Sequence, residues 1–244
     1  MVIANADFEQ IYQKDLVYVP DCWKLCGDAH CCSFARYKSR FRLIAQTSFQ
    51  EIPLLPGEYQ FLESKNWLTQ FGDFDYKVVE YAIDGGVVRA ESVVSRRPNC
   101  ACDHDTRPTI CRLYPLLPVF DITGRLIGTE LLGIYEELEQ IDQMAPACQL
   151  TSLPFDQIKG FLAITSQLGL SPISLFYIEA YRLTKRHVAD RLAQRRPTAK
   201  GDAFTLFESG FIRRNLIDQD LLRGQLGELA RSFQQHYGNA ISLA

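Results

Sequence analysis

The chain has 244 residues, of which 47% are hydrophobic and 23% are charged, and its formal net charge is -3. This composition is typical of a globular protein and excludes an intrinsically disordered chain. The weak negative charge provides no basic surface for a phosphate backbone, so nucleic acid is not expected as a partner.

The chain also shows no export or membrane signal. Residues 1–7 lack the basic and apolar regions of a signal peptide. No segment reaches the roughly 18 consecutive apolar residues that a membrane helix requires. We therefore expect a cytoplasmic protein with no membrane partner. In a reducing compartment, its 8 cysteines indicate metal or redox chemistry and not disulfides.

The N-terminal half mixes extended and helical patterns. Pro53 and Pro56 hold the residues before them out of the helical region. Asp84-Gly85-Gly86 lies between two runs of β-branched and aromatic residues, which predicts a hairpin. In chain order, we expect a short element at 7–19, helical spacing at 34–41, an extended segment at 51–57, a helix at 57–70, strands at 77–83 and 87–94, a second hairpin at 116–122 and 125–132, and a helix at 136–144.

Beyond residue 150 the cysteines stop and helical periodicity dominates. A helix is expected over 154–168, a second from Pro172, and an amphipathic third over 216–237, with a polar linker at 195–202. The predicted fold class is therefore α+β. A cysteine-rich, metal-centred domain with small antiparallel hairpins spans 1–150, and a helical C-terminal extension packed on it spans 151–244.

The cysteines form two groups with the spacing of metal ligands. Thiolates bind zinc and iron, and both tetrahedral zinc and iron–sulfur clusters take four ligands. The cysteines could serve two four-ligand sites or one polynuclear site. For Cys148, a simple buried thiol is the alternative. The predicted metal ligands are Cys22, Cys26, Cys31, Cys32, Cys100, Cys102, Cys111 and Cys148.

Cationic residues flank both groups. Four thiolates around one divalent ion leave about two negative charges, which are costly to bury. Arg107 and Arg112 lie within five residues of Cys111, and we predict that they hydrogen-bond to sulfur as part of the cofactor site. The cations over 36–42 have a solvated helix face as the alternative role. His30 and His104 are candidates to replace a thiol ligand, with a surface role as the alternative.

Three motifs within residues 22–150 resemble a known family. They are the cysteine group at 22–32, the extended segment and acidic helix start at 52–58, and Arg107-Pro108-Thr109-Ile110-Cys111-Arg112. Together they resemble the YkgJ family of zinc- or iron-chelating proteins, whose cluster reads CxxCxxCC and whose later segment reads RPxxCR. The first group here has gaps of three and four residues where the family has two and two.

The resemblance implies a metal-chelating cysteine-cluster protein that binds zinc or iron, the latter as an ion or an iron–sulfur cluster. A similar cluster occurs in the flagellin lysine methylases, so an iron–sulfur enzyme that modifies a protein or a small substrate is a second hypothesis. A structural zinc module that presents the C-terminal helices to a protein partner is a third. The sequence leaves open whether the chain is an enzyme, because it contains no P-loop, GxGxxG or HExxH motif.

Overall fold

The computed structural model describes residues 6–14, 16, 40–41, 43–44, 50–83, 86–97, 103, 105–144, 154–195 and 203–238. Over these residues the fold is α+β with small antiparallel sheets and a helical C-terminal part, as predicted. The elements are α1 (Phe8–Tyr12), β1 (Gln50–Leu54), α3 (Glu58–Ser64), the 3-10 helix η3 (Trp67–Phe71), β2 (Phe74–Ile83), β3 (Gly86–Ser95), α4 (Thr109–Leu113), β4 (Leu116–Phe120), β5 (Leu126–Leu131), α5 (Ile134–Ile141), α6 (Phe155–Gly169), α7 (Pro172–Arg195), α8 (Ala203–Ile212) and α9 (Gln219–Tyr237).

Both predicted hairpins are confirmed. β2 and β3 pair antiparallel down to Ile83 and Gly86, although residues 84–85 of the turn lie outside the described residues. β4 and β5 form the second hairpin. The extended segment at 51–57 begins as β1, which adds to β3 and gives a sheet of order β1-β3-β2. Pro53 is accommodated because β1 is an edge strand, where a missing backbone donor costs little.

The helix predicted over 57–70 is wrong as a single element. α3 ends at Ser64, and η3 starts only after Asn66, whose φ of 58° is left-handed. A left-handed residue cannot continue a right-handed helix, and asparagine adopts that conformation at low cost. The structure also contains α4 and α8, which the sequence patterns did not predict.

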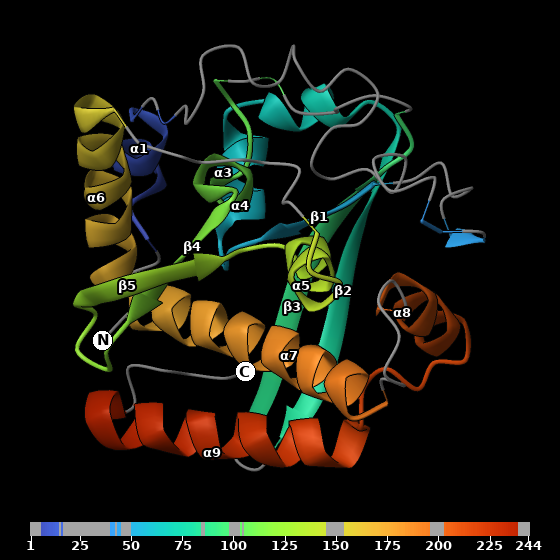
Figure 1. Ribbon diagram of the computed structural model, residues 1–244. Coiled ribbons are helices and arrows are strands. Elements are labelled where there is room, and N and C mark those ends of the chain that lie inside the picture. Colours follow the sequence, from blue (N-terminus) through green and yellow to red (C-terminus); the bar gives the residue numbers. More distant parts are fainter. Residues whose placement is uncertain are drawn as a thin grey trace.

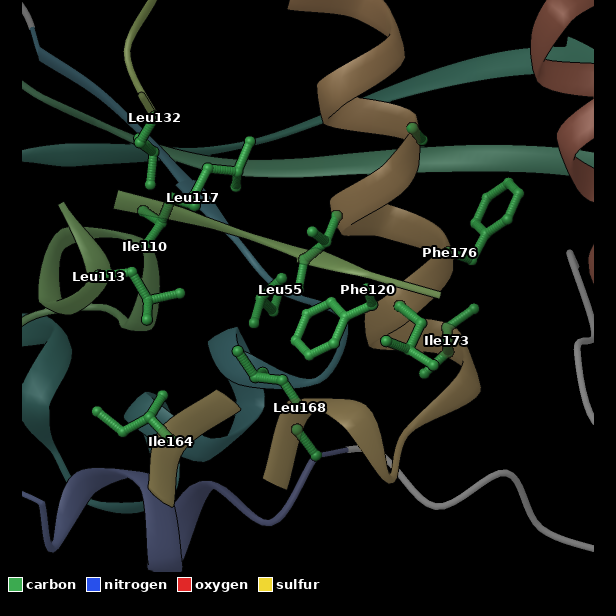
Figure 2. Close-up of a cluster of buried hydrophobic side chains, with 14 of the residues drawn as sticks. Leu55, Ile110, Leu113, Leu117, Phe120, Leu132, Ile164, Leu168, Ile173 and Phe176 are labelled. Atoms are coloured by element: carbon green, nitrogen blue, oxygen red, sulfur yellow. The ribbon is translucent and has the colours of Figure 1, made fainter. Parts of the chain in front are cut away.

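The main hydrophobic core joins the two halves of the chain. In Figure 1, α6 stands beside α1, while α7 crosses in front of the sheet above α9. Figure 2 shows Leu113 of α4, Phe120 of β4 and Leu168 of α6 directed into one interior space. Residues before and after position 150 therefore share a core. The domain boundary at 150 remains a prediction.

Two smaller hydrophobic clusters lie outside the main core, one beneath the sheet and one beside α8. Ile52 and Val93 pack with Leu62 and Phe71, so one sheet face is covered by α3 and η3. A separate cluster joins Leu138 of α5 to α7 and α8. Among the described helices, none alone has the length and apolar character to cross a membrane, whereas α6 and α7, bent by 108°, pass that test only when taken together.

Candidate functional site

Two arginines connect the segment before the first cysteine group to α4. Arg112 donates from Nε to the carbonyl of Arg107 (3.0 Å), from Nη1 to that of Lys14 (3.0 Å), and from Nη2 to that of Asp105. Arg107 donates to the carbonyl of Leu16. Leu16 therefore lies beside the helix that carries Cys111.

A buried carboxylate reinforces this connection. Glu58 is 0% exposed, and its Oε1 accepts hydrogen bonds from the hydroxyl of Tyr12 (2.8 Å) and from the backbone N–H and hydroxyl of Thr109 (both 2.6 Å). Its Oε2 accepts from the backbone N–H of Leu55 (3.0 Å). Burial raises the pKa of Glu58 above its ordinary value, and the hydrogen bonds oppose that shift. One side chain thus connects α1, α3 and α4.

The aromatic ring of Tyr12 completes the contact. The guanidinium of Arg112 lies 4.5 Å from its centroid, a cation–π distance. The rings of Phe61 and Trp67 lie 5.0 and 5.5 Å away. Arg112 is only 3% exposed, so its charge is held between an aromatic ring and backbone carbonyls.

The segment after the first cysteine group is anchored on α5 and α8. Phe41 is 3% exposed, and its ring lies 5.3 Å from that of Phe204 and 5.8 Å from that of Tyr135. The carboxylate of Glu208 accepts hydrogen bonds from the backbone N–H groups of Leu43 (2.6 Å) and Ile44 (3.0 Å). Phe41 and Ile44, which come after the first cysteine group in the sequence, are therefore packed in the interior.

The segments beside the other cysteines are also fixed. Gln50 donates to the carbonyl of Arg97 (2.9 Å), three residues before Cys100. Gln70 accepts from the backbone N–H of Asp103 (3.0 Å), the residue after Cys102. Met144, which precedes Cys148, packs into the cluster that contains Phe41.

Of the eight predicted ligands, the structure describes Cys111, which is half-buried on α4. The described residues contain no group of three or more His, Cys, Asp or Glu side chains that could hold a metal ion. The predicted convergence of thiols therefore stays a prediction. The following predicted site residues lie outside the described part of the chain: Cys22, Cys26, Cys31, Cys32, Cys100, Cys102, Cys148, His30 and His104.

The predicted hydrogen bonds from Arg107 and Arg112 to sulfur also stay predictions. In the structure both guanidinium groups donate to backbone carbonyls, a role that no sequence pattern predicted. The Nε atom of Arg107 is buried and has no acceptor among the described residues. A buried guanidinium N–H without an acceptor is costly, and a thiolate is an acceptor that would satisfy it.

Cys111 borders a hollow between the sheet and the helices, which we call the wide hollow. Its volume is about 480 Å³, within the range of small-molecule sites. The sheet face opposite to α3 forms its floor, and α4, α5, α7 and α8 supply the other walls. The lining residues include Glu51, Pro53, Lys77, Tyr81, Ala90, Ser92, Ile110, Cys111, Tyr114, Gly133, Tyr135, Glu136, Tyr181 and Phe211.

A tyrosine and a glutamate shape the wall beside Cys111. The hydroxyl of Tyr114 donates to the carboxylate of Glu136, which is 2% exposed. A Cβ atom at Gly133 would lie 1.9 Å from the Oε2 of Glu136, so a larger residue there would displace this carboxylate. Burial raises the pKa of Tyr135 and of Tyr181 well above the ordinary value, so both remain neutral phenols.

Comparison of the chain with protein-family models, curated proteins and solved structures finds no match. The resemblance to the YkgJ family therefore rests on its quoted motifs and remains a prediction. Sequence reasoning missed the roles of Glu58, Glu136 and Glu208. Glu208 lies within an apolar stretch and Glu58 begins a predicted helix, but many exposed acids share such positions. Glu136 begins an acidic run and carries no such signal.

Proposed function

We propose that this chain is a metal-chelating cysteine-cluster protein that binds zinc or iron. The observation that carries the proposal is the pair of arginine contacts that hold Lys14 and Leu16 beside the helix of Cys111. Residues far apart in sequence, one just before the first cysteine group and one within the second, are neighbours there. This arrangement is what a shared metal site would require.

The remaining contacts support the same proposal. The segments next to Cys100 and Cys102 are held by Gln50 and Gln70, and Met144 shares a cluster with Phe41. The buried Nε of Arg107 fits a site that contains thiolate, because it needs an acceptor. When bound, the metal would supply a charged centre that organises this end of the fold.

The second candidate is an iron–sulfur enzyme that modifies a protein or a small substrate. The specific observation in its favour is the wide hollow, which brings a space of about 480 Å³ to the side of Cys111. A purely structural zinc site is normally closed and has no need of such a space. The hollow therefore favours a site with an exchangeable ligand.

Anaerobic purification followed by elemental analysis and a visible spectrum tests the proposal. The proposal expects zinc or iron in stoichiometric amount. Colourless protein with zinc supports the zinc form or the structural module, whereas broad visible absorption with iron and sulfide supports the second candidate. Folded protein that carries no metal after anaerobic purification contradicts all three forms.

A further inference from the structure

The floor of the wide hollow exposes the middle of the sheet. Ala90 lies on β3, the central strand, and is nevertheless solvent-exposed. Its neighbour Pro53 on β1 is exposed as well. The centre of a sheet face is normally covered by side chains from another layer. Here the wide hollow separates α5 and α7 from the sheet, and the small side chain of Ala90 does not fill it.

A second, apolar chamber extends the wide hollow. This narrow hollow has a volume of about 200 Å³ and shares Pro53, Tyr81, Ala90 and Tyr181 with the wide one. The two chambers therefore lie along the same sheet face. Apolar side chains supply most of the narrow hollow's walls, namely Leu55, Val88, Ile110, Leu117, Ile178, Leu222 and Leu226.

The narrow hollow is bordered by Glu91, Thr184 and three tyrosines besides its apolar walls, whereas the wide hollow carries an ion pair and a serine on its floor. Lys77 donates to Oε1 (2.8 Å) and Oε2 (3.1 Å) of Glu51, and the hydroxyl of Ser92 donates to the same carboxylate (3.0 Å). A ligand that occupies both chambers would therefore have an apolar part in the narrow hollow and a polar part near Glu51 and Ser92.

The most exposed charges at the wide hollow form an ion pair. Lys77 and Glu51 neutralise each other. Glu136 accepts from Tyr114 and is only 2% exposed, so a ligand reaches little of its carboxylate. Strand alternation directs the side chain of Glu91 to the opposite sheet face, where it hydrogen-bonds with Tyr76. A charged ligand group in the wide hollow would lose water beside an ion pair that already satisfies both of its charges and beside a carboxylate that is almost entirely buried.

We propose that the wide and narrow hollows together bind one elongated molecule with a hydrocarbon chain and an uncharged, hydrogen-bonding end. The chain lies along Pro53, Ala90 and Tyr81 into the narrow hollow. The uncharged end lies in the wide hollow, where Ser92 and the Lys77–Glu51 pair offer both donors and acceptors. This inference rests on the two hollows alone and requires no metal.

Alkyl glucosides of increasing chain length, each below its critical micelle concentration, are suitable probes. Isothermal titration calorimetry on the full chain should give an affinity that rises roughly fourfold per methylene until the narrow hollow is filled. Octyl glucoside should bind more tightly than octyltrimethylammonium or octanoate. An affinity that does not depend on chain length overturns the proposal. Tighter binding of either charged probe contradicts the assignment of an uncharged end to the ligand.

Two matched substitutions distinguish this site from general detergent binding. Ala90→Phe places a ring on the floor of the wide hollow and should lower the affinity for octyl glucoside by at least about tenfold. Ala82→Phe places the same ring on the opposite face of the same sheet, at another exposed position, and should leave binding unchanged. Equal effects of the two substitutions indicate an adventitious additive only and overturn the proposal. If Ala90→Phe does not fold, Ala90→Leu serves the same comparison with a smaller expected loss.

Discussion

The guanidinium of Arg112 donates a hydrogen bond of 3.0 Å to the carbonyl of Lys14, a residue 98 positions away in sequence. This contact places the start of the segment that leads to Cys22 against the helix of Cys111. It also ties the short helix α4 to a distant part of the chain. Arg112 reaches three backbone carbonyls from one planar group. Two of them belong to the loop just before α4, at Asp105 and Arg107, and the third belongs to Lys14.

Arg112→Lys tests this contact. Lysine keeps the charge but cannot reach three carbonyls with a planar fork, so we expect unfolding free energy to fall by about 3 kcal/mol. The metal content should fall with it. Urea unfolding and elemental analysis measure the two effects. Arg125→Lys, at an exposed ion pair with Asp121, is the control and should change stability by less than about 0.5 kcal/mol. Equal losses in the two variants would contradict the role of Arg112.

Phe41→Ala tests the anchoring of the segment that follows the first cysteine group. The ring of Phe41 is buried against Tyr135 and Phe204, so its removal should cost about 3–5 kcal/mol. Leu43→Ala removes a neighbouring side chain that is 61% exposed and should be nearly neutral. Thermal or urea unfolding measures both. A neutral effect of Phe41→Ala would show that the segment does not depend on this cluster.

The sequence predicted the local helices and strands better than the tertiary contacts between them. Alternation and turn residues were sufficient for both hairpins, because register and turn chemistry are local properties. The break at Asn66 was missed, since many asparagines lie within helices and only the backbone reveals the left-handed one. The contacts of Arg112 and Glu58 join residues distant in sequence, and no periodicity encodes such contacts. The wide hollow was equally invisible, because it depends on where α5 and α7 stand relative to Ala90.

Glu58→Gln should reveal the titration of a buried carboxyl. Burial raises the pKa of Glu58 above its ordinary value of 4.5. Its protonation therefore contributes stability that is complete below that value and is lost as the pH rises through the raised pKa. We expect the unfolding free energy of the wild type to fall relative to that of the variant as the pH rises above 4.5.

Urea unfolding over a series of pH values measures this difference. Glu63→Gln, which removes an exposed carboxyl on the same helix, should leave the pH dependence of the wild type unchanged. A wild-type unfolding free energy that instead rises relative to that of Glu58→Gln as the pH rises would contradict the assignment.

Gly133→Ala tests the packing beside Cys111. The new Cβ would lie 1.9 Å from the Oε2 of Glu136, so this carboxylate must move away and strain its contact with Tyr114. The expected cost is about 1–3 kcal/mol. Gly128→Ala is a matched control, because a Cβ there meets nothing within 4 Å. Thermal unfolding of both variants measures the difference, and similar melting temperatures would show that the space at Gly133 is not restricted.

The most direct test of the account is the metal content of a Cys31→Ser, Cys32→Ser double variant, purified anaerobically beside the wild type. The account predicts stoichiometric zinc or iron in the wild type and its loss in the double variant, because serine supplies no thiolate. Cys148→Ser should lower the metal content less. Full metal occupancy in the double variant, or a folded wild type without metal, would contradict the central claim that cysteines distant in sequence share a metal.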